Sequence, residues 1–236
     1  MVSIIGIIGT LPIIIVFLIC FALVIRSYIK NPNRTKIFFM IWAIASAFTY
    51  VGWFCRVLFV PQFESDKTVL YPFWVMGYTA GATALISLAF ASLDQTKIKE
   101  SIIIIIIRII ILVTYAGVLI ILFVGGFEQE LVVFMDVTDL TIEDNFVFYY
   151  FTILILFYIF FPNAIYIMYL LKSEEKDSFT YKRVRIIEIG ILIWSLCILL
   201  DGLRFPSNIG ILIIRIILMI GGLITMKGFL MKPKEK

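Results

Sequence analysis

The chain alternates between long apolar runs and short polar segments. A bilayer-spanning helix needs roughly 20 apolar residues, and seven runs are long enough: residues 3–27, 38–60, 70–92, 101–125, 146–171, 186–204 and 207–227. Backbone groups in lipid must be hydrogen-bonded within their own segment, so the runs are expected to be helices rather than strands. The predicted fold is an all-α integral membrane protein in which residues 1–236 form one bundle of seven transmembrane helices.

Composition supports this assignment. Hydrophobic residues make up 62% of the 236 and charged residues 15%, and the mean hydropathy is +1.09. Soluble proteins rarely expose large apolar patches to water. A chain with so many apolar side chains could not bury all of them in its own core and would expose such patches. The chain is therefore expected to have membrane lipids as its surroundings.

The basic residues predict the orientation. If the N-terminus is outside, the inner segments hold fifteen of the twenty Lys and Arg residues: Arg26, Lys30, Arg34, Lys36, Lys97, Lys99, Lys172, Lys176, Lys182, Arg183, Arg185, Lys227, Lys232, Lys234 and Lys236. Cytoplasmic loops carry this excess in most membrane proteins. The N-terminus is thus predicted outside and the C-terminus in the cytoplasm, in a plasma membrane. The C-terminal lysines suit lipid headgroups better than a nucleic acid.

Helix phase predicts which runs lie inside the bundle. The run 70–92 places Gly77, Gly81, Ala84 and Ala91 on one stripe, and small residues let helices approach closely in lipid. The stretch "SIIIIIIRIII" at 101–111 is instead isoleucine on nearly every face. We therefore expect the third helix to be the most buried and the fourth to be the most exposed to lipid.

Arg108 interrupts that isoleucine stretch, and an intramembrane arginine is costly unless it is paired or can reach the interface. It shares a stripe with Ser101 and Tyr115, so its side chain is expected to point into the bundle. Glu188 is the other charge in the same inner half. An Arg108–Glu188 buried ion pair is the resulting prediction.

A second group of charges lies toward the outer side: Arg56, Asp201, Arg204 and Arg215. Asp201 and Arg204 are three residues apart on one helix, a spacing at which they can neutralise each other. Arg56 and Arg215 are then left without a carboxylate. An anion-binding site formed by these residues, with Trp53 and Trp74 as its apolar wall, is one interpretation; pairing with helix-end carbonyls and lipid is the other.

Several chemistries lack their essential residues. The chain has no histidine and three cysteines without a paired motif, so bis-histidine haem, His-zinc and Ser-His sites are not predicted. No metal or other cofactor is expected, and a catalytic role is not favoured. The segment 126–145 carries six acids and contains "LVVFMDVTDLTI", a β-prone run typical of a small hairpin; its spacing matches no calcium loop.

Three functions remain open from the residues. The first is a receptor or sensor that binds a small anionic, partly apolar ligand in the outer half and offers the basic loop 172–185 to a cytoplasmic partner. The second is a transporter built as three helices, one linking helix and three helices, in which Pro162 and Asn163 interrupt a span. The third is a non-catalytic accessory subunit that uses the small-residue face of the third helix.

Overall fold

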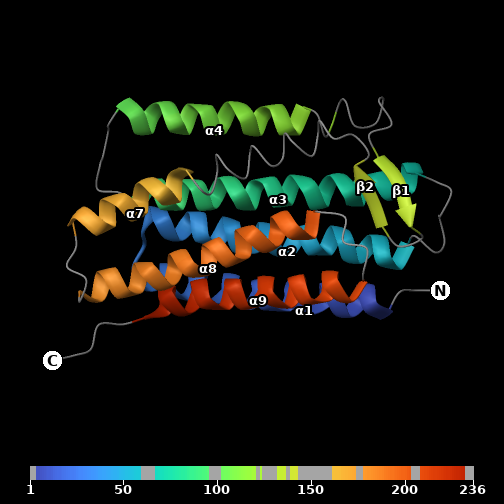
Figure 1. Ribbon diagram of the computed structural model, residues 1–236, viewed down its shortest axis with the longest axis horizontal. Helices are drawn as coiled ribbons and strands as arrows, with labels where there is room; N and C mark the ends of the chain where they lie inside the picture. Colours follow the sequence, from blue (N-terminus) through green and yellow to red (C-terminus); the bar gives the residue numbers. More distant parts are fainter. Residues whose placement is uncertain are drawn as a thin grey trace.

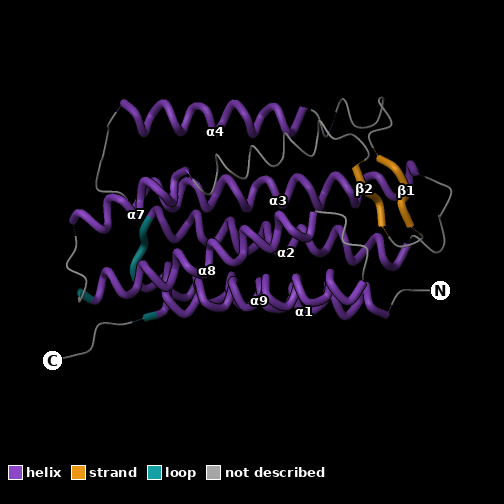
Figure 2. Tube along the Cα trace, viewed as in Figure 1, coloured by secondary structure: helices purple, strands orange, loops and turns teal. Residues whose placement is uncertain are grey.

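The computed structural model describes residues 4–59, 67–95, 102–120, 123, 132–136, 139–142, 161–173, 178–202 and 208–231. Within these ranges the helices are α1 (Ile4–Lys30), α2 (Arg34–Phe59), α3 (Lys67–Gln95), α4 (Ile102–Ile120), α7 (Phe161–Ser173), α8 (Phe179–Gly202) and α9 (Asn208–Leu230). The helices lie side by side with their axes roughly parallel (Figures 1 and 2), as expected of a helical bundle.

Four described segments are long and apolar enough to cross a membrane: Gly6–Lys30, Arg34–Phe59, Val75–Asp94 and Ile209–Leu230. Ile102–Gly117 in α4 is a shorter apolar helix. Together with the composition, these helices indicate a multi-pass membrane protein. Of the other described helices, α7 is shorter and α8 carries more charged residues.

The helices pack as neighbours in a definite order. α2 packs between α1 and α3, α8 packs along α9, and α9 also contacts α1, while α7 and α4 lie against α3. The apolar segment of α3 is 61% buried, compared with 39–44% in the other three candidate spans. Isoleucines project to the exterior of α4 along most of its length, and Figure 1 shows α4 at the edge of the bundle. The expected contrast between these two helices is confirmed.

A β-hairpin lies at the end of the bundle where α1 begins (Figure 1). Strand β1 (Val132–Asp136) pairs antiparallel with β2 (Asp139–Ile142), in a register that places Val132 opposite Ile142, with an irregularity between Phe134 and Asp136. A small hairpin was predicted here from the β-prone run of the segment. We call this end of the bundle the hairpin end.

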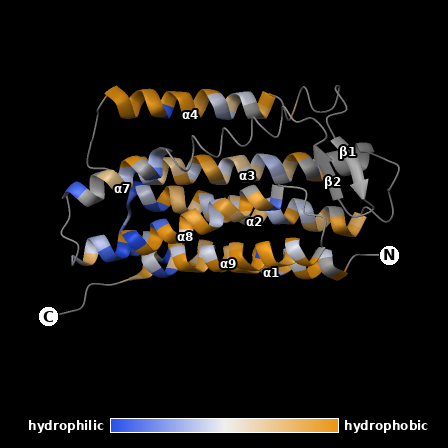
Figure 3. Ribbon diagram, viewed as in Figure 1, coloured by the Kyte–Doolittle hydropathy of each residue, from blue (hydrophilic) through white to orange (hydrophobic). Residues whose placement is uncertain are grey.

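Hydrophilic residues gather at the opposite end of the bundle (Figure 3), and the described bases there include Lys36, Lys182, Arg183 and Arg185; we call it the basic end. Some of them bind the ends of neighbouring helices. Lys36 donates from Nζ to the carbonyls of Ser27 and Asn31, 2.9 and 2.7 Å away, and so satisfies the C-terminus of α1. Arg183 donates to the carbonyls of Gly228 and Phe229, which belong to the last turn of α9. Cations in these positions satisfy orphan carbonyls and complement the helix dipole.

The basic segment 172–185 is not the continuous loop that was expected. Residues 172–173 belong to α7 and residues 179–185 to α8, and Ser178 accepts a hydrogen bond at Oγ from the backbone N–H of Tyr181 at 3.1 Å. Serine is a preferred N-cap because its oxygen satisfies a free N–H of the first turn. The helix therefore begins at the cap rather than where the apolar run begins.

Most small hydroxyl side chains within the helices bond to their own backbone. The hydroxyls of Thr10, Thr49, Ser195 and Thr225 each donate to the carbonyl four residues earlier, at 2.6–3.0 Å. This arrangement removes the cost of burying a hydroxyl without a partner in the neighbouring helix.

Gly52 marks the closest approach of α2 to α3. A Cβ built there would lie 2.6 Å from the carbonyl oxygen of Phe73 and 2.9 Å from the backbone nitrogen of Gly77. A Cβ built at Gly81 in the same interface would lie no closer than 3.7 Å to Thr49, which is an ordinary contact. The two glycines thus form a matched pair in one interface.

We expect Gly52→Ala to destabilise the folded protein by about 1–3 kcal/mol, because backbone atoms cannot move aside as side chains can. Gly81→Ala should be neutral or stabilising by up to about 1 kcal/mol, since alanine is the better helix former. Free energies of unfolding, measured by titration of the purified protein from mild detergent into SDS, compare the two. Equal losses would contradict the backbone contact.

Candidate functional site

An ion pair connects α8 and α9 near the hairpin end. Arg215 Nε lies 3.1 Å from Asp201 Oδ1 and 3.4 Å from Oδ2, and the two side chains are only 11% and 10% exposed. Arg215 is the eighth residue of α9, so it lies about 10 Å from the start of that helix. Because both side chains are buried, removal of either one would leave the other as an uncompensated charge.

Two aromatic side chains of α2 complete the surroundings of the pair. Tyr50 donates its hydroxyl to Asp201 Oδ2 at 3.2 Å. The Arg215 guanidinium carbon lies 5.8 Å from the centre of the Tyr50 ring and 5.9 Å from that of Trp53. These distances are within the range of cation–π attraction, which strengthens where water is excluded. We call Tyr50, Trp53, Asp201 and Arg215 the Arg215 cluster.

A glycine of α1 makes room for the guanidinium. A Cβ at Gly9 would lie 3.2 Å from Arg215 Nη1 and 3.5 Å from Arg215 Cδ. Larger side chains at this position would push the arginine away from Asp201. The cluster is therefore built where four helices, α1, α2, α8 and α9, come together.

The register of α8 against α9 explains why Asp201 meets Arg215. Near the basic end, a Cβ at Gly228 would lie 2.7 Å from Ile187 Cγ1; one helical turn further along, a Cβ at Gly190 would lie 2.4 Å from Thr225 Oγ1. In each pair the two residue numbers have nearly the same sum, as antiparallel helices in a fixed register require, and Asp201 with Arg215 continues the series. Close glycine contacts thus determine the partner of the arginine.

The structure brings together three of the six residues predicted to bind a ligand: Trp53, Asp201 and Arg215. Arg204 and the side chains of Arg56 and Trp74 lie outside the described part of the chain. Tyr50 and Gly9 were missed. A buried tyrosine near the end of an apolar helix usually needs a hydroxyl partner, and that requirement was the available signal for Tyr50.

One expectation about this group needs correction. Arg215 was expected to lack a carboxylate because Asp201 was assigned to Arg204 three residues later. Asp201 instead pairs with Arg215, fourteen residues further along the chain. The packing of α8 against α9 explains this pairing, because it places Asp201 and Arg215 opposite each other in the buried interface.

Arg108 also has a different partner from the predicted one. Its Nη2 lies 3.9 Å from Asp94 Oδ1 at the end of α3, where Arg34 Nε also lies 3.7 Å away and Thr35 donates its hydroxyl to Oδ2 at 2.9 Å. Both oxygens of Glu188 are buried without a hydrogen-bond partner in the described part of the chain. The Arg108–Glu188 ion pair is therefore not formed, because α4 packs against α3 and not against α8.

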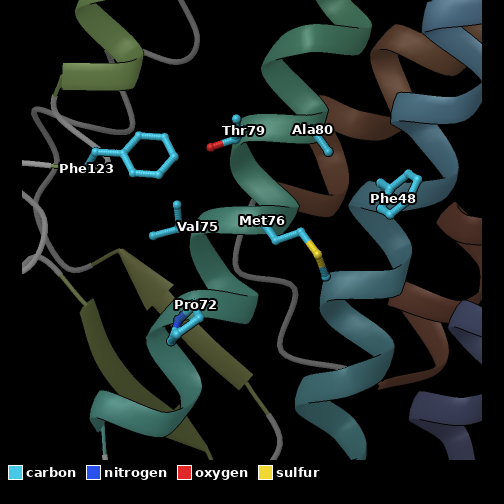
Figure 4. Close-up of a pocket in the computed structure, with 7 residues that line it drawn as sticks. All are labelled: Phe48, Pro72, Val75, Met76, Thr79, Ala80 and Phe123. Atoms are coloured by element: carbon cyan, nitrogen blue, oxygen red, sulfur yellow. The ribbon is translucent and has the colours of Figure 1, made fainter.

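An open groove of about 490 Å³ lies on the hairpin-end half of α3 (Figure 4). Its walls are apolar apart from one hydroxyl, and they consist of Phe48, Pro72, Val75, Met76, Thr79, Ala80 and Phe123. None of the residues of the Arg215 cluster lines it. Among the described residues that line the groove, none carries a charge that could orient an anion.

Among the described residues, no group of His, Cys, Asp or Glu side chains is arranged to hold a metal ion. Comparison with protein-family models, with curated proteins and with solved structures gives no match. Any functional conclusion therefore depends on the geometry of the chain itself.

Asp201→Asn should destabilise the protein by about 3–5 kcal/mol, because it leaves a buried arginine without its counter-charge. Asp94→Asn is the matched change at the more exposed cluster of the basic end and should cost about 0–1 kcal/mol. The free energy of unfolding in detergent measures both.

The double change Asp201→Asn with Arg215→Met should recover part of the loss, since no unpaired charge then remains. If the two single losses simply add in the double variant, the two side chains do not depend on each other.

Proposed function

We propose that this chain is a seven-span plasma-membrane protein with its N-terminus outside and its C-terminus in the cytoplasm. The proposal is supported by the described helices and by the excess of lysine and arginine at the basic end, because cytoplasmic loops normally carry such an excess. The hairpin end is then the outer end, and the Arg215 cluster lies in the outer half of the bundle.

In this proposal the protein acts as a receptor or sensor for a small anionic, partly apolar ligand. One observation carries it: Asp201, held by Tyr50 and Arg215, is the carboxylate that an incoming anion would imitate. A ligand carboxylate or phosphate would replace Asp201 at the guanidinium, where charge-assisted bonds are strongest, while Trp53 and Tyr50 would contact its apolar part.

Such an exchange has a path to the other end of the protein. Helix α8 carries Asp201 near its outer end and the exposed residues Lys182 and Arg185 near its inner end. A helix of its 24 residues is about 36 Å long and moves as one body. Release of Asp201 from Arg215 would loosen α8 from α9 and shift the basic surface that we assign to a cytoplasmic partner.

The position of α4 favours a second candidate function. In a transporter with two three-helix repeats, the helix that links the repeats is the one expected at the periphery, and α4 lies there against α3. Flux of a radiolabelled carboxylate through proteoliposomes distinguishes this alternative, because a receptor binds its ligand without moving it across the membrane.

The span count and orientation can be tested in intact cells. After Cys20, Cys55 and Cys197 are replaced by Ala, single cysteines can be introduced at four positions between spans and one after the last span: Asp66, Lys99, Glu143, Lys176 and Lys234. A membrane-impermeant maleimide should label positions 66 and 143 only, and the other three should react after the membrane is opened. Labelling of 143 and 176 from the same side would contradict the crossing between them.

Ligand binding can be tested with octanoate as the probe, in lipid nanodiscs, with octanamide as the uncharged control. Octanoate should raise the thermal unfolding temperature of the wild type, and octanamide should not. Asp201→Asn should show the larger shift because the internal competitor is gone, whereas Arg215→Met should show none. An octanoate shift that persists in Arg215→Met, or an equal shift with octanamide, would eliminate this site.

A further inference from the structure

Glu188 of α8 is a buried carboxylate that neither the Arg215 cluster nor the basic-end ion pairs use. It is 4% exposed, and neither of its oxygens has a hydrogen-bond partner in the described part of the chain. Asn163 of α7 is 1% exposed; its Oδ1 accepts a hydrogen bond from the Ser92 hydroxyl of α3, but its Nδ2 has no partner.

One buried contact between α7 and α8 indicates that these two side chains lie at similar distances from the basic end. Tyr166 of α7 packs against Val184 of α8 in a small buried cluster with Tyr181. The two helices are antiparallel and joined at the basic end (Figure 1). Asn163 lies three residues before Tyr166 and Glu188 lies four residues after Val184. Along their helices these steps are rises of about 4.5 and 6 Å, both directed away from the basic end.

The position combines an acceptor and a donor that do not bond to each other. A buried ionised carboxylate is costly in a membrane interior unless a cation or several donors compensate for it. Of the charged and titratable groups on the surrounding helices, Lys36, Asp94 and Arg183 bind other partners. Lys227 is exposed, and Tyr166 is buried against Val184. Among the described residues, none of them forms an ion pair with Glu188.

We propose that Glu188 is a proton-binding site within the membrane, with Asn163 and Ser92 as its neighbouring polar groups. The carboxylate takes up one proton and later releases it. The only bond that forms and breaks is the O–H bond of the carboxyl group. In the protonated state the carboxyl needs no counter-charge. The site then lies in the inner half of the bundle, on the helix that also carries Asp201.

The polar neighbours give the proton a defined environment. Asn163 is fixed by Ser92 through its carbonyl oxygen, so its amide group is the part that can face α8. An amide can donate to a carboxyl oxygen in either protonation state. Loss of the proton would make the acceptor a charged carboxylate, for which such a hydrogen bond is stronger, and so would change the contact between α7 and α8. Pro162, next to Asn163 and also buried, has no backbone N–H to donate at that turn.

Dicyclohexylcarbodiimide tests the proposal because it reacts with protonated carboxyl groups in apolar surroundings. Mass spectrometry of the full-length protein in nanodiscs should find the adduct at Glu188, with a yield that falls as the pH rises. Asp201 is the matched control, because it is also buried but ion-paired with Arg215, and it should not react. No adduct at Glu188, or a yield independent of pH, would overturn the proposal.

Two further measurements complete the test. Glu188→Gln should remove the adduct and leave the thermal unfolding temperature unchanged or higher, since the amide imitates the neutral carboxyl. A lower unfolding temperature would show that the ionised carboxylate is needed, against the proposal. Protection from the reagent by sodium chloride but not by choline chloride would identify a sodium ion instead of a proton and would also overturn it.

Discussion

Backbone contact at glycines is the constraint on which the rest of this structure depends. Gly190 and Gly221 bring α8 and α9 so close that a Cβ at either would meet backbone atoms of the other helix within 3 Å. Hydrophobic burial alone cannot choose between registers in lipid, because lipid is as apolar as the side chains. Close glycine contacts can, and they place Asp201 opposite Arg215. Gly52 fixes α2 against α3 in the same way.

Burial and charge then follow from this packing. Helices α2, α8 and α9 surround the Arg215 guanidinium with one carboxylate and two aromatic rings. The core beside it is aromatic as well: Trp42 lies edge-on to Phe17 and to Trp194, with ring centroids 5.4 and 5.8 Å apart. Such edge-to-face contacts have a preferred geometry, so they resist rotation of the helices about their axes and keep the cluster aligned.

The sequence was sufficient for the features that depend on one helix at a time. Apolar runs located the described helices, the isoleucines of α4 predicted its peripheral position, and a β-prone run predicted the hairpin. It was not sufficient for pairs between helices. Arg108 was assigned to Glu188 from their shared depth and from the polar stripe of the fourth helix. Neither signal says which helices are neighbours, and Asp94 at the end of α3 proved to be the partner. The first residues of α2 and α8 were missed because each helix begins at a cap that lies before its apolar run. Asn33 accepts a hydrogen bond at Oδ1 from the backbone N–H of Thr35 in α2, and Ser178 caps α8 in the same way.

The pairing of Asp201 with Arg215 also bears on how the chain enters its membrane. Two charged residues would each oppose insertion of an isolated span, at roughly 2.5–3.5 kcal/mol apiece on the translocon scale. Here the opposite charges lie on consecutive helices, at facing levels, and separated by only a short connection. We expect α8 and α9 to leave the translocon together as a helical hairpin that neutralises itself. Its partner helices then need to supply only an aromatic surface, and the order of synthesis becomes part of the folding pathway.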